Sequence, residues 1–255
     1  PAEEVIPYLE ELPTMGALTE AKEMLLGWDR RMEHESPEAA LFALFMQNLV
    51  NGLFVDQIPD ELWNDSSRLT EGSRVQSAIA SLLESPENAW WDDVRTPDTQ
   101  ETRDEILLAA LTAAIGEGRE LFEGKRMSDW RWGTIHTAEF QNLSFGESGV
   151  GIVERLFNRG PVAVDGGLEQ VLAADWDLTE PYEVAHLSSM RQILDFSDLE
   201  TARTIHTTGQ SGHPFHRHYD DMIDRWAAVE YRNSEFSREA IEEGPNRVLE
   251  LVPRE

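Results

Sequence analysis

Apolar residues recur at helical spacing early in the chain. After Thr14, the residues Leu18, Ala21, Leu25 and Trp28 follow one another at intervals of three or four positions. Side chains at these intervals lie on one face of an α-helix. This stretch therefore predicts an amphipathic helix with one buried face.

The segment that begins at Ser36 predicts a second helix, buried on most sides. The Ser36 hydroxyl can cap a helix N-terminus, and Pro37 suits the first helical position. Apolar residues then occupy more than one face: Ala40, Leu41, Phe42, Leu44, Phe45, Met46, Leu49 and Val50. A helix that is apolar around most of its girth is typical of a protein core.

Two further helices are predicted at residues 73–83 and 99–122. The second is strongly periodic through Ile106, Ala110 and Ala114. Residues 84–98, which contain proline and tryptophan, are predicted to connect the two. Residues 1–126 are therefore expected to form a mainly helical region.

After Met127, short β-prone runs alternate with turn signals such as Asp165-Gly166-Gly167. One amphipathic helix, expected at 217–231, would place Tyr219, Ile223 and Trp226 on one face. Grouped helices followed by grouped strands indicate an α+β fold, with a mixed strand and helix region at 127–255. Strands are expected at residues 161–164, 170–174, 190–196, 203–207 and 247–252.

Composition narrows the class of protein. Hydrophobic residues make up 40% of the chain and charged residues 27%, which is enough apolar material for a core. The absence of cysteine excludes disulfides, thiol catalysis and cysteine-ligated zinc. No apolar run is expected to approach the ~20 residues of a membrane span, and no charged-then-apolar leader opens the chain. Because the sequence starts at Pro1, we expect a processed or shortened chain.

The charge is strongly acidic. Forty-nine acidic residues face 21 basic ones, for a formal net charge of −28. Nucleic acid and anionic membranes are therefore not expected as partners, because both need clustered cationic groups. The acids are dispersed, and Lys22 and Lys125 are the only lysines. This pattern resembles the surfaces of proteins from salt-loving organisms, where a Debye length of ~3 Å at 1 M salt screens self-repulsion.

The turn from Gly209 to Pro214 offers one candidate nucleophile, Ser211. The run Gly-Gln-Ser-Gly-His resembles a nucleophile elbow, but its fifth position is His213 instead of glycine. Asp220 and the nearby histidines follow too closely for the chain order of an α/β-hydrolase. We therefore favour a structural turn whose glycines permit positive φ.

Two clusters could bind a ligand. His206, His213, His216 and His218 are dense enough for a transition metal, but their spacing matches no zinc signature. The aromatic residues Trp130, Trp132 and His136 could line a pocket, although packing in a core is the simpler interpretation. Dispersed acids single out no general acid or base. No residue is assigned a catalytic, cofactor-binding or metal-binding role.

Three blocks resemble the penicillin acylase family, in the correct order. They are WRWGTIHT at 130–137; FNRGPV at 157–162 with DGG at 165–167 and SMR at 189–191; and TGQSGHP at 208–214 with HYDD at 218–221 and Trp226. The chain also departs from the family pattern. GGLEQ at 166–170 replaces a G-D-G-x-T-V-N motif, Met190 replaces an aromatic residue, and His216-Arg217 replaces Ser-Pro. The departures indicate a divergent branch.

The resemblance implies an amide-bond hydrolase whose strands contribute to the four-layer αββα core of the N-terminal-nucleophile hydrolases. Members of this family are made as precursors that cut themselves and expose an N-terminal serine, whose own amine is the base. Those elements precede the matched region, so the resemblance implies the C-terminal portion of a large (beta) subunit. The nucleophilic serine is then expected on another segment or chain.

The resemblance also implies the partners. They are the other acylase chain or chains with the N-terminal serine, and a small acyl amide whose acyl group stays open. No cofactor is implied in this chain, calcium is allowed elsewhere in the assembled enzyme, and a periplasmic or secreted location is suggested. Two alternatives stay open. One is a non-catalytic binding or assembly protein that retains the fold. The other is a self-contained hydrolase that uses Ser211 with a local histidine.

Overall fold

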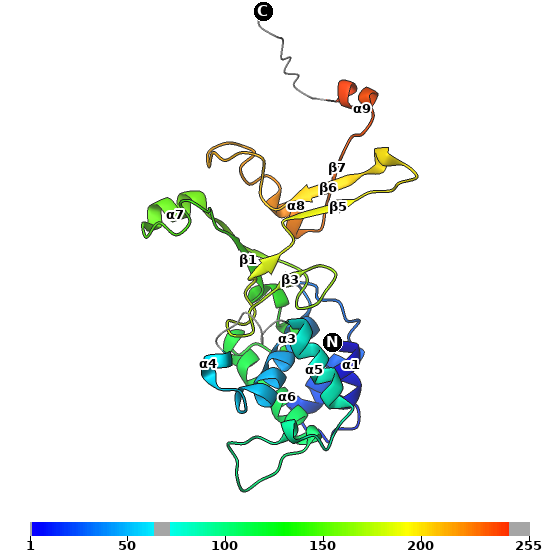
Figure 1. Cartoon of the computed structure of the whole chain (residues 1–255), viewed down its shortest axis with the longest axis vertical. Coiled ribbons are helices and arrows are strands. Elements are labelled where there is room, and N and C mark those ends of the chain that lie inside the picture. The colour runs from blue at the N-terminus through cyan, green and yellow to red at the C-terminus, as the bar shows by residue number, and fades with distance from the viewer. Residues whose placement is uncertain (1, 64–71, 245–255) are drawn as a thin grey trace, which may run out of the picture. The chain divides into compact units, whose positions relative to one another are not determined.

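The computed structural model describes residues 2–63 and 72–244 (Figure 1). The chain divides into two compact units, Pro1–Leu187 and Ser188–Glu255. The change from mainly helical to mixed sequence, after residue 126, falls inside the first unit. That unit therefore contains strands as well as the helical region. Each unit is described by itself below.

Helices dominate the first part of unit 1, and the three predicted to begin after Thr14, at Ser36 and near residue 73 begin there. Ser36 caps α3 as expected, since its Oγ accepts the amide of Ala39 at 3.0 Å. The predicted helix at 99–122 begins later, at Arg103, because Thr102 and Glu105 form a capping box there. The segments are α1 (Ala2–Val5), η1 (Ile6–Leu9), α2 (Ala17–Gly27), α3 (Pro37–Val50), η2 (Asn51–Val55), α4 (Asp60–Trp63), α5 (Gly72–Leu83), η3 (Ala89–Trp91), α6 (Arg103–Leu121), η4 (Met127–Asp129) and η5 (Trp132–Thr134).

Helix α3 is the centre of the unit 1 core, and α2 and α6 pack against it. Leu41, Leu44 and Leu49 are fully buried, as predicted for a helix that is apolar on most sides. In the described residues, one stretch, Pro37–Val55, is long and apolar enough to span a membrane by length and composition. The expectation that no such run exists was therefore wrong. Because 72% of its apolar window is buried inside the protein, this stretch fits a core helix.

Short antiparallel strands complete unit 1. They are β1 (Thr137–Phe140), β2 (Arg159–Ala163), β3 (Ala174–Asp175) and β4 (His186–Leu187), with the helix α7 (Gly151–Phe157) between β1 and β2. Among the described residues, β1 pairs with β2 and β3 pairs with β4. The predicted strand at 170–174 was wrong except at Ala174. The Gln170 amide donates to the Gly167 carbonyl at 3.3 Å, which closes a turn in its place.

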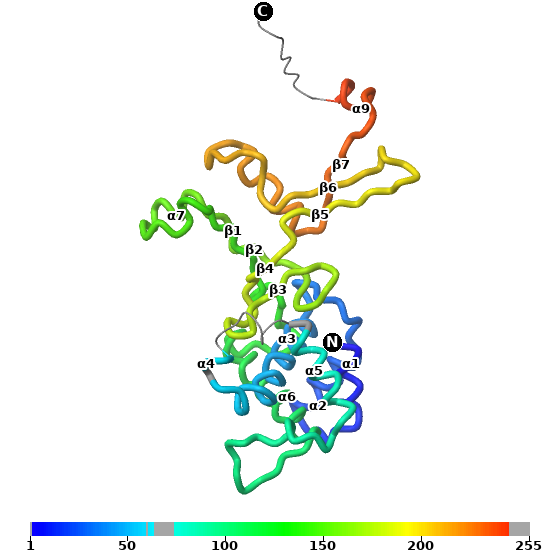
Figure 2. Tube along the Cα trace, in the orientation of Figure 1, coloured from blue at the N-terminus to red at the C-terminus, as the bar shows by residue number. Residues whose placement is uncertain are grey.

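Unit 2 contains a three-stranded antiparallel sheet in the order β5–β6–β7 (Figure 2). Met190 pairs with His206 and Ile193 with Arg203, so the predicted strands at 190–196 and 203–207 are found in shortened form. The predicted strand at 247–252 lies outside the described residues. The elements are β5 (Met190–Ile193), η6 (Leu199–Thr201), β6 (Arg203–His206), α8 (Ile223–Ala227), β7 (Arg232–Asn233) and α9 (Arg238–Glu243).

The predicted helix at 217–231 was wrong in length. Only Ile223–Ala227 is helical. The preceding residues form successive turns, and the amide of Met222 donates to the carbonyl of Thr208 at 2.9 Å instead of to a helical partner. Ile223 and Trp226 are buried as expected, but Tyr219 lies in the turns and is partly exposed.

Candidate functional site

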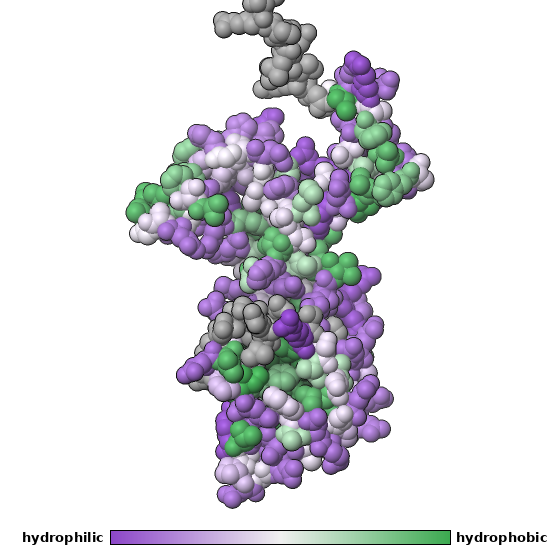
Figure 3. Space-filling view, viewed as in Figure 1, coloured by the Kyte–Doolittle hydropathy of each residue, from purple (hydrophilic) through white to green (hydrophobic). Residues whose placement is uncertain are grey.

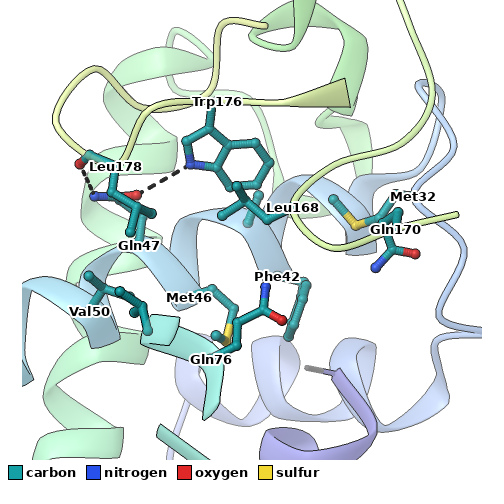
Figure 4. Close-up of a pocket in the computed structure, with 12 residues that line it drawn as sticks. Met32, Phe42, Met46, Gln47, Val50, Gln76, Leu168, Gln170, Trp176 and Leu178 are labelled. Atoms are coloured by element: carbon teal, nitrogen blue, oxygen red, sulfur yellow. Dashed lines mark hydrogen bonds between the residues drawn. The ribbon is translucent and has the colours of Figure 1, made fainter. Parts of the chain in front are cut away.

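An apolar pocket lies between α3, α5 and the segment that contains Leu168 and Trp176 (Figure 4). The empty space within it and at its open mouth together is about 480 Å³, but the enclosed cavity volume open to the centre of a water molecule is only about 30 Å³. The side chains that define its surface are Met32, Phe42, Met46, Val50, Val75, Leu168, Trp176 and Leu178, with Gln47, Gln76 and Gln170 as polar neighbours. Residues from more than 130 positions apart therefore meet at one cavity.

The most buried polar side chain of the pocket is Gln47, and its amide is engaged by protein groups. Its Nε2 donates to the Leu178 carbonyl at 2.9 Å, and its Oε1 accepts from the indole of Trp176 at 3.4 Å (Figure 4). Gln47 thus fastens the 168–178 segment to α3. A satisfied amide contributes little polarity to the cavity, so the pocket suits an apolar group.

Trp176 also belongs to an aromatic cluster behind the pocket. The Trp132 and His136 rings stack with centroids 4.3 Å apart, and Trp132 meets Trp176 edge-on at 5.4 Å. The indole of Trp132 donates to the Gly166 carbonyl at 3.0 Å. Both Trp132 and His136 are fully buried, which favours the interpretation of this group as core. Trp130 is separate from it and stacks on Phe122 with centroids 5.1 Å apart.

His136 is the unusual member of the cluster. Its Nδ1 lies 2.6 Å from the Tyr182 carbonyl, so Nδ1 carries the proton and donates. Its Nε2 is buried without a hydrogen-bond partner in the described structure. Burial lowers the pKa of His136 to about 4, although the Tyr182 carbonyl and the charge of Asp165 oppose the shift. The imidazole is therefore neutral at physiological pH.

Tyr182 links the cluster to two helices. Its hydroxyl donates to Glu117 Oε1 at 2.8 Å, and Asn48 Nδ2 donates to Glu117 Oε2 at 2.6 Å. Burial, and then the Glu117 charge, raise the pKa of the Tyr182 phenol, so it stays protonated. This chain of hydrogen bonds holds the wall behind the pocket against α3 and α6.

The Asp165-Gly166-Gly167 turn is structural. Asp165 Oδ1 accepts from the His34 amide at 2.7 Å and lies 2.6 Å from the His34 ring. A side chain at Gly166 would meet the Leu172 carbonyl at 2.2 Å, so only glycine fits. The roles of Gln47 and His34 were not predicted from the sequence. A glutamine within the apolar stretch of α3 was the available signal for Gln47, but the His34–Asp165 pairing spans 131 residues and had none.

Ser211 is held in a turn. Its Oγ accepts the amide of His213 at 3.1 Å, and its amide donates to the His218 carbonyl at 2.9 Å. No histidine ring is among the hydrogen-bond partners of this hydroxyl in the described part of the chain, so the geometry gives the nucleophile hypothesis no support. The predicted positive φ was wrong at both Gly209 and Gly212. Gly209 is required instead because a Cβ there would lie 2.2 Å from the His218 carbonyl.

The rings of His216 and His218 lie with centroids 5.3 Å apart, but the four histidines of this region do not form one site. His218 Nδ1 lies 2.7 Å from Asp221 Oδ2, and its Nε2 accepts from Arg217 at 2.8 Å. His216 and His213 accept backbone amides through their Nδ1 atoms. Across residues 2–63 and 72–244, no group of three or more histidine, aspartate or glutamate side chains is arranged to hold a metal ion. The metal hypothesis therefore gains no support from the geometry.

Comparison with known proteins gives the relationship. A family model described as penicillin amidase matches residues 1–243. An acyl-homoserine lactone acylase, QuiP, from Pseudomonas aeruginosa is 29% identical over 246 residues, which cover 92% of this chain and 29% of the relative. The QuiP acylase of Pseudomonas fluorescens strain Pf0-1 is 30% identical over 233 residues, covering 91% of this chain and 27% of the relative.

The fold also resembles a solved structure. A thermostable penicillin G acylase from Alcaligenes faecalis aligns with a TM-score of 0.53 and 14% identity, covering 99% of this chain and 46% of that chain. The chain thus spans less than a third of the length of the curated relatives that it matches. The mixed helix and sheet architecture resembles that of the penicillin acylases, and by its family match the chain belongs to the penicillin amidase family.

Proposed function

We propose that this chain is the C-terminal portion of an amide-bond hydrolase of the penicillin acylase type, with its nucleophilic serine on another segment or chain. The observation that carries the proposal is the family match over residues 1–243 in a chain that covers only 29% of its QuiP relative. In this proposal the strands of the chain contribute to a four-layer αββα core, and the helical region supports it.

The substrate proposed is a small acyl amide of the N-acyl-homoserine lactone type, after the names of the relatives. Its acyl group is apolar, and the pocket over α3 is apolar with its buried Gln47 already engaged by the protein. We assign the pocket as part of the wall that receives the acyl group. This chain supplies shape and desolvation there, while the remainder of the enzyme supplies the reacting groups.

The first test compares the isolated chain with the chain assembled with the remainder of its acylase. Release of homoserine lactone from N-acyl-homoserine lactones of several chain lengths is measured. The isolated chain is expected to be inactive and the assembly active. Robust turnover by the isolated chain would contradict the proposal. Assembly without turnover would identify a non-catalytic binding or assembly protein instead.

The second test fills the pocket. Met46→Trp places a larger side chain at the cavity, and Met15→Trp is the matched control because Met15 is 86% exposed. Pocket filling should raise KM for long acyl chains by about tenfold relative to short ones, the scale of losing one to two methylene contacts. The control should change nothing. Equal effects on all chain lengths, with an unchanged melting temperature, would remove the pocket assignment.

A further inference from the structure

Residues 141–158 form an arm between β1 and β2 that exposes apolar side chains. Leu143 is 104% exposed and Ile152 is 80% exposed, and Phe145 and Val150 are also exposed. Helix α7, which forms part of the arm, has no fully buried residue. Hydrophobic side chains are visible on the surface of this segment (Figure 3). Large apolar groups gathered on one element mark an interaction site more often than scattered ones.

The arm has a defined internal structure. Asn158 Oδ1 accepts the Asn142 amide at 3.0 Å, and Asn158 Nδ2 donates to the Gly146 carbonyl at 3.0 Å. Asn142 Oδ1 in turn accepts the amides of Ser144 and Phe145 at 3.1 Å. The two asparagines therefore fix the base of the arm. A shape that is already ordered loses little entropy when it binds.

Glycine and aromatic packing support the same shape. A Cβ at Gly146 would lie 2.6 Å from the Asn142 carbonyl oxygen and from Asn158 Oδ1, so the chain passes closely there. The Phe145 and Phe157 rings pack with centroids 4.5 Å apart. This packing orders the inside of the arm but leaves Leu143 and Ile152 uncovered.

The ribbon that carries the arm is also incomplete by itself. In the described residues, β1 and β2 pair only with each other, and an isolated two-stranded ribbon is marginal in water. The inner end is supported, since the Val184 amide donates to the Thr137 carbonyl at 3.1 Å. The outer end leads directly into the exposed arm (Figure 2).

The charge of the chain helps to identify the partner that binds the arm. The chain carries a formal charge of −28, whereas the arm contains only Glu147, Glu154 and Arg155 as charged residues. Two copies of the chain would repel one another, and so would the chain and an anionic membrane. The family relatives contain more than twice as much further chain as they share with this one. That further chain is the partner that the observations favour.

We infer that the arm at 141–158 docks into an apolar recess on the remainder of the acylase, with Leu143 and Ile152 as anchors. This inference rests on the proposed function, since it takes the partner to be the rest of that enzyme. Full burial of a leucine or isoleucine is worth enough to change a dissociation constant by about tenfold or more. In this inference the arm contributes to assembly.

The test measures the dissociation constant between this chain and the remainder of the acylase. Leu143→Ser and Ile152→Ser should each weaken binding about tenfold or more. The matched control is Val171→Ser, because Val171 is equally exposed in the same unit but lies outside the arm, and it should leave binding within about twofold. Thermal melts of the isolated variants should match the parent chain, since the substituted side chains are exposed.

A second measurement keeps the inference falsifiable if a variant misfolds. Hydrogen exchange of the unmodified complex should show new protection in residues 141–158. Unchanged binding in both variants, or an arm that gains no protection in an assembled and active complex, would overturn the inference while leaving the proposed function intact. If the two parts neither associate nor hydrolyse amides, both the docking inference and the proposed function would be overturned. Self-association, or binding to neutral lipid vesicles that the arm variants abolish, would assign the arm to a different partner and also overturn it.

Discussion

The helical region of unit 1 and the described residues of unit 2, 188–244, use their apolar residues in opposite ways. In the helical region, α2, α3 and α6 bury their apolar faces against one another, and residues such as Leu25, Leu44 and Leu111 are fully buried. In unit 2, a small core forms around Ile205 and Trp226. Within residues 188–244, most of the other large apolar side chains are exposed: Met190, Ile193, Leu194, Phe196, Phe215, Phe236 and Ile241.

This difference indicates which part of the chain has a core that needs no further neighbours. Helices satisfy their own backbone and need only a shared face to form a core. Short strands need neighbours for their edges, and a sheet of three short strands buries little by itself. We therefore expect the helical region to hold most of the stability of the isolated chain, and residues 188–244 to depend on the small core around Trp226.

The largest expected loss of stability comes from a substitution in that small core. Trp226→Ala deletes a buried ring that donates to the Ser188 carbonyl at 3.1 Å and supports the Arg191 guanidinium at 4.8 Å. It should cost unit 2 about 3–5 kcal/mol, as for other buried aromatic residues. Hydrogen exchange resolved by segment should show the loss in residues 188–244 only. Phe236→Ala, at a 62% exposed ring, is the control and should be neutral.

Unfolding of the helical region by Trp226→Ala would contradict the contrast between the two units. In that case the two parts form one cooperative system, and the closure attributed to the helices is incorrect. A harmless Trp226→Ala would show instead that the small core of unit 2 contributes nothing to its order.

The next effect belongs to unit 1 and depends on pH. The pKa of His136 is lowered to about 4 in the folded chain from a usual 6.5, so the unfolded chain binds the proton more readily. Its contribution is present above pH 6.5 and is lost as pH falls from 6.5 toward 4. By linkage this amounts to ~3 kcal/mol. Denaturant melts between pH 7 and pH 4 measure the loss.

A His136→Gln variant isolates this contribution. Asp175 shifts in the opposite sense, because burial raises its pKa and protonation of that carboxyl relieves a cost as pH falls. The quantity to compare is therefore the difference between the two pH profiles, not the parent profile alone. Parallel profiles would show that His136 is accessible to protons in the folded state, which would contradict its burial.

The same contrast explains which elements of the fold could be predicted from the sequence. The helices at α2, α3, α5 and α6 were predicted because spacing and caps such as Ser36 are local signals. The long helix at 217–231 was wrong because a distant bond, from the Met222 amide to the Thr208 carbonyl, replaces helical pairing. β1, β4 and β7 were missed, since each is short and depends on a partner strand.

The candidate pocket was harder to predict from the sequence than the fold. The apolar residues of α3 were predicted as core, but their meeting with Leu168 and Trp176 depends on contacts across more than 120 residues. No periodicity encodes such a meeting. The family, by contrast, was found from three short blocks, and the penicillin amidase match over residues 1–243 confirmed it. Blocks such as the Gly209 turn are informative because close backbone contacts allow few residues there.

A smaller effect is expected from salt. The chain has 28 acidic residues in excess of its basic ones, and their repulsion opposes a compact state in dilute buffer. Molar sodium chloride should raise the melting temperature by roughly 2–4 °C, the shift that about 1 kcal/mol produces in a domain of this size. The helical region should gain as much as unit 2, since the acids are dispersed. A flat or falling curve would remove the salt-adaptation hypothesis and leave the family assignment unaffected.

The smallest effect compares one serine from each region. Ser36 and Ser211 make similar bonds, since their hydroxyls accept the amides of Ala39 at 3.0 Å and His213 at 3.1 Å. Ser36 begins the central helix α3, so Ser36→Ala should cost about 1 kcal/mol of stability. Ser211 lies in a partly exposed turn, so Ser211→Ala should cost no more than about 1 kcal/mol because water can replace its bond. Denaturant melts followed by segment measure both.

Activity of the assembled enzyme gives the Ser211 comparison its functional meaning. If the turn is structural, Ser211→Ala should leave amide hydrolysis unchanged, as Ser36→Ala should once the protein is folded. Abolished hydrolysis in Ser211→Ala alone, with unchanged melts, would make Ser211 the nucleophile. That result would move the catalytic centre into unit 2 and reverse the comparison, because the unit with the smaller core would then carry the chemistry.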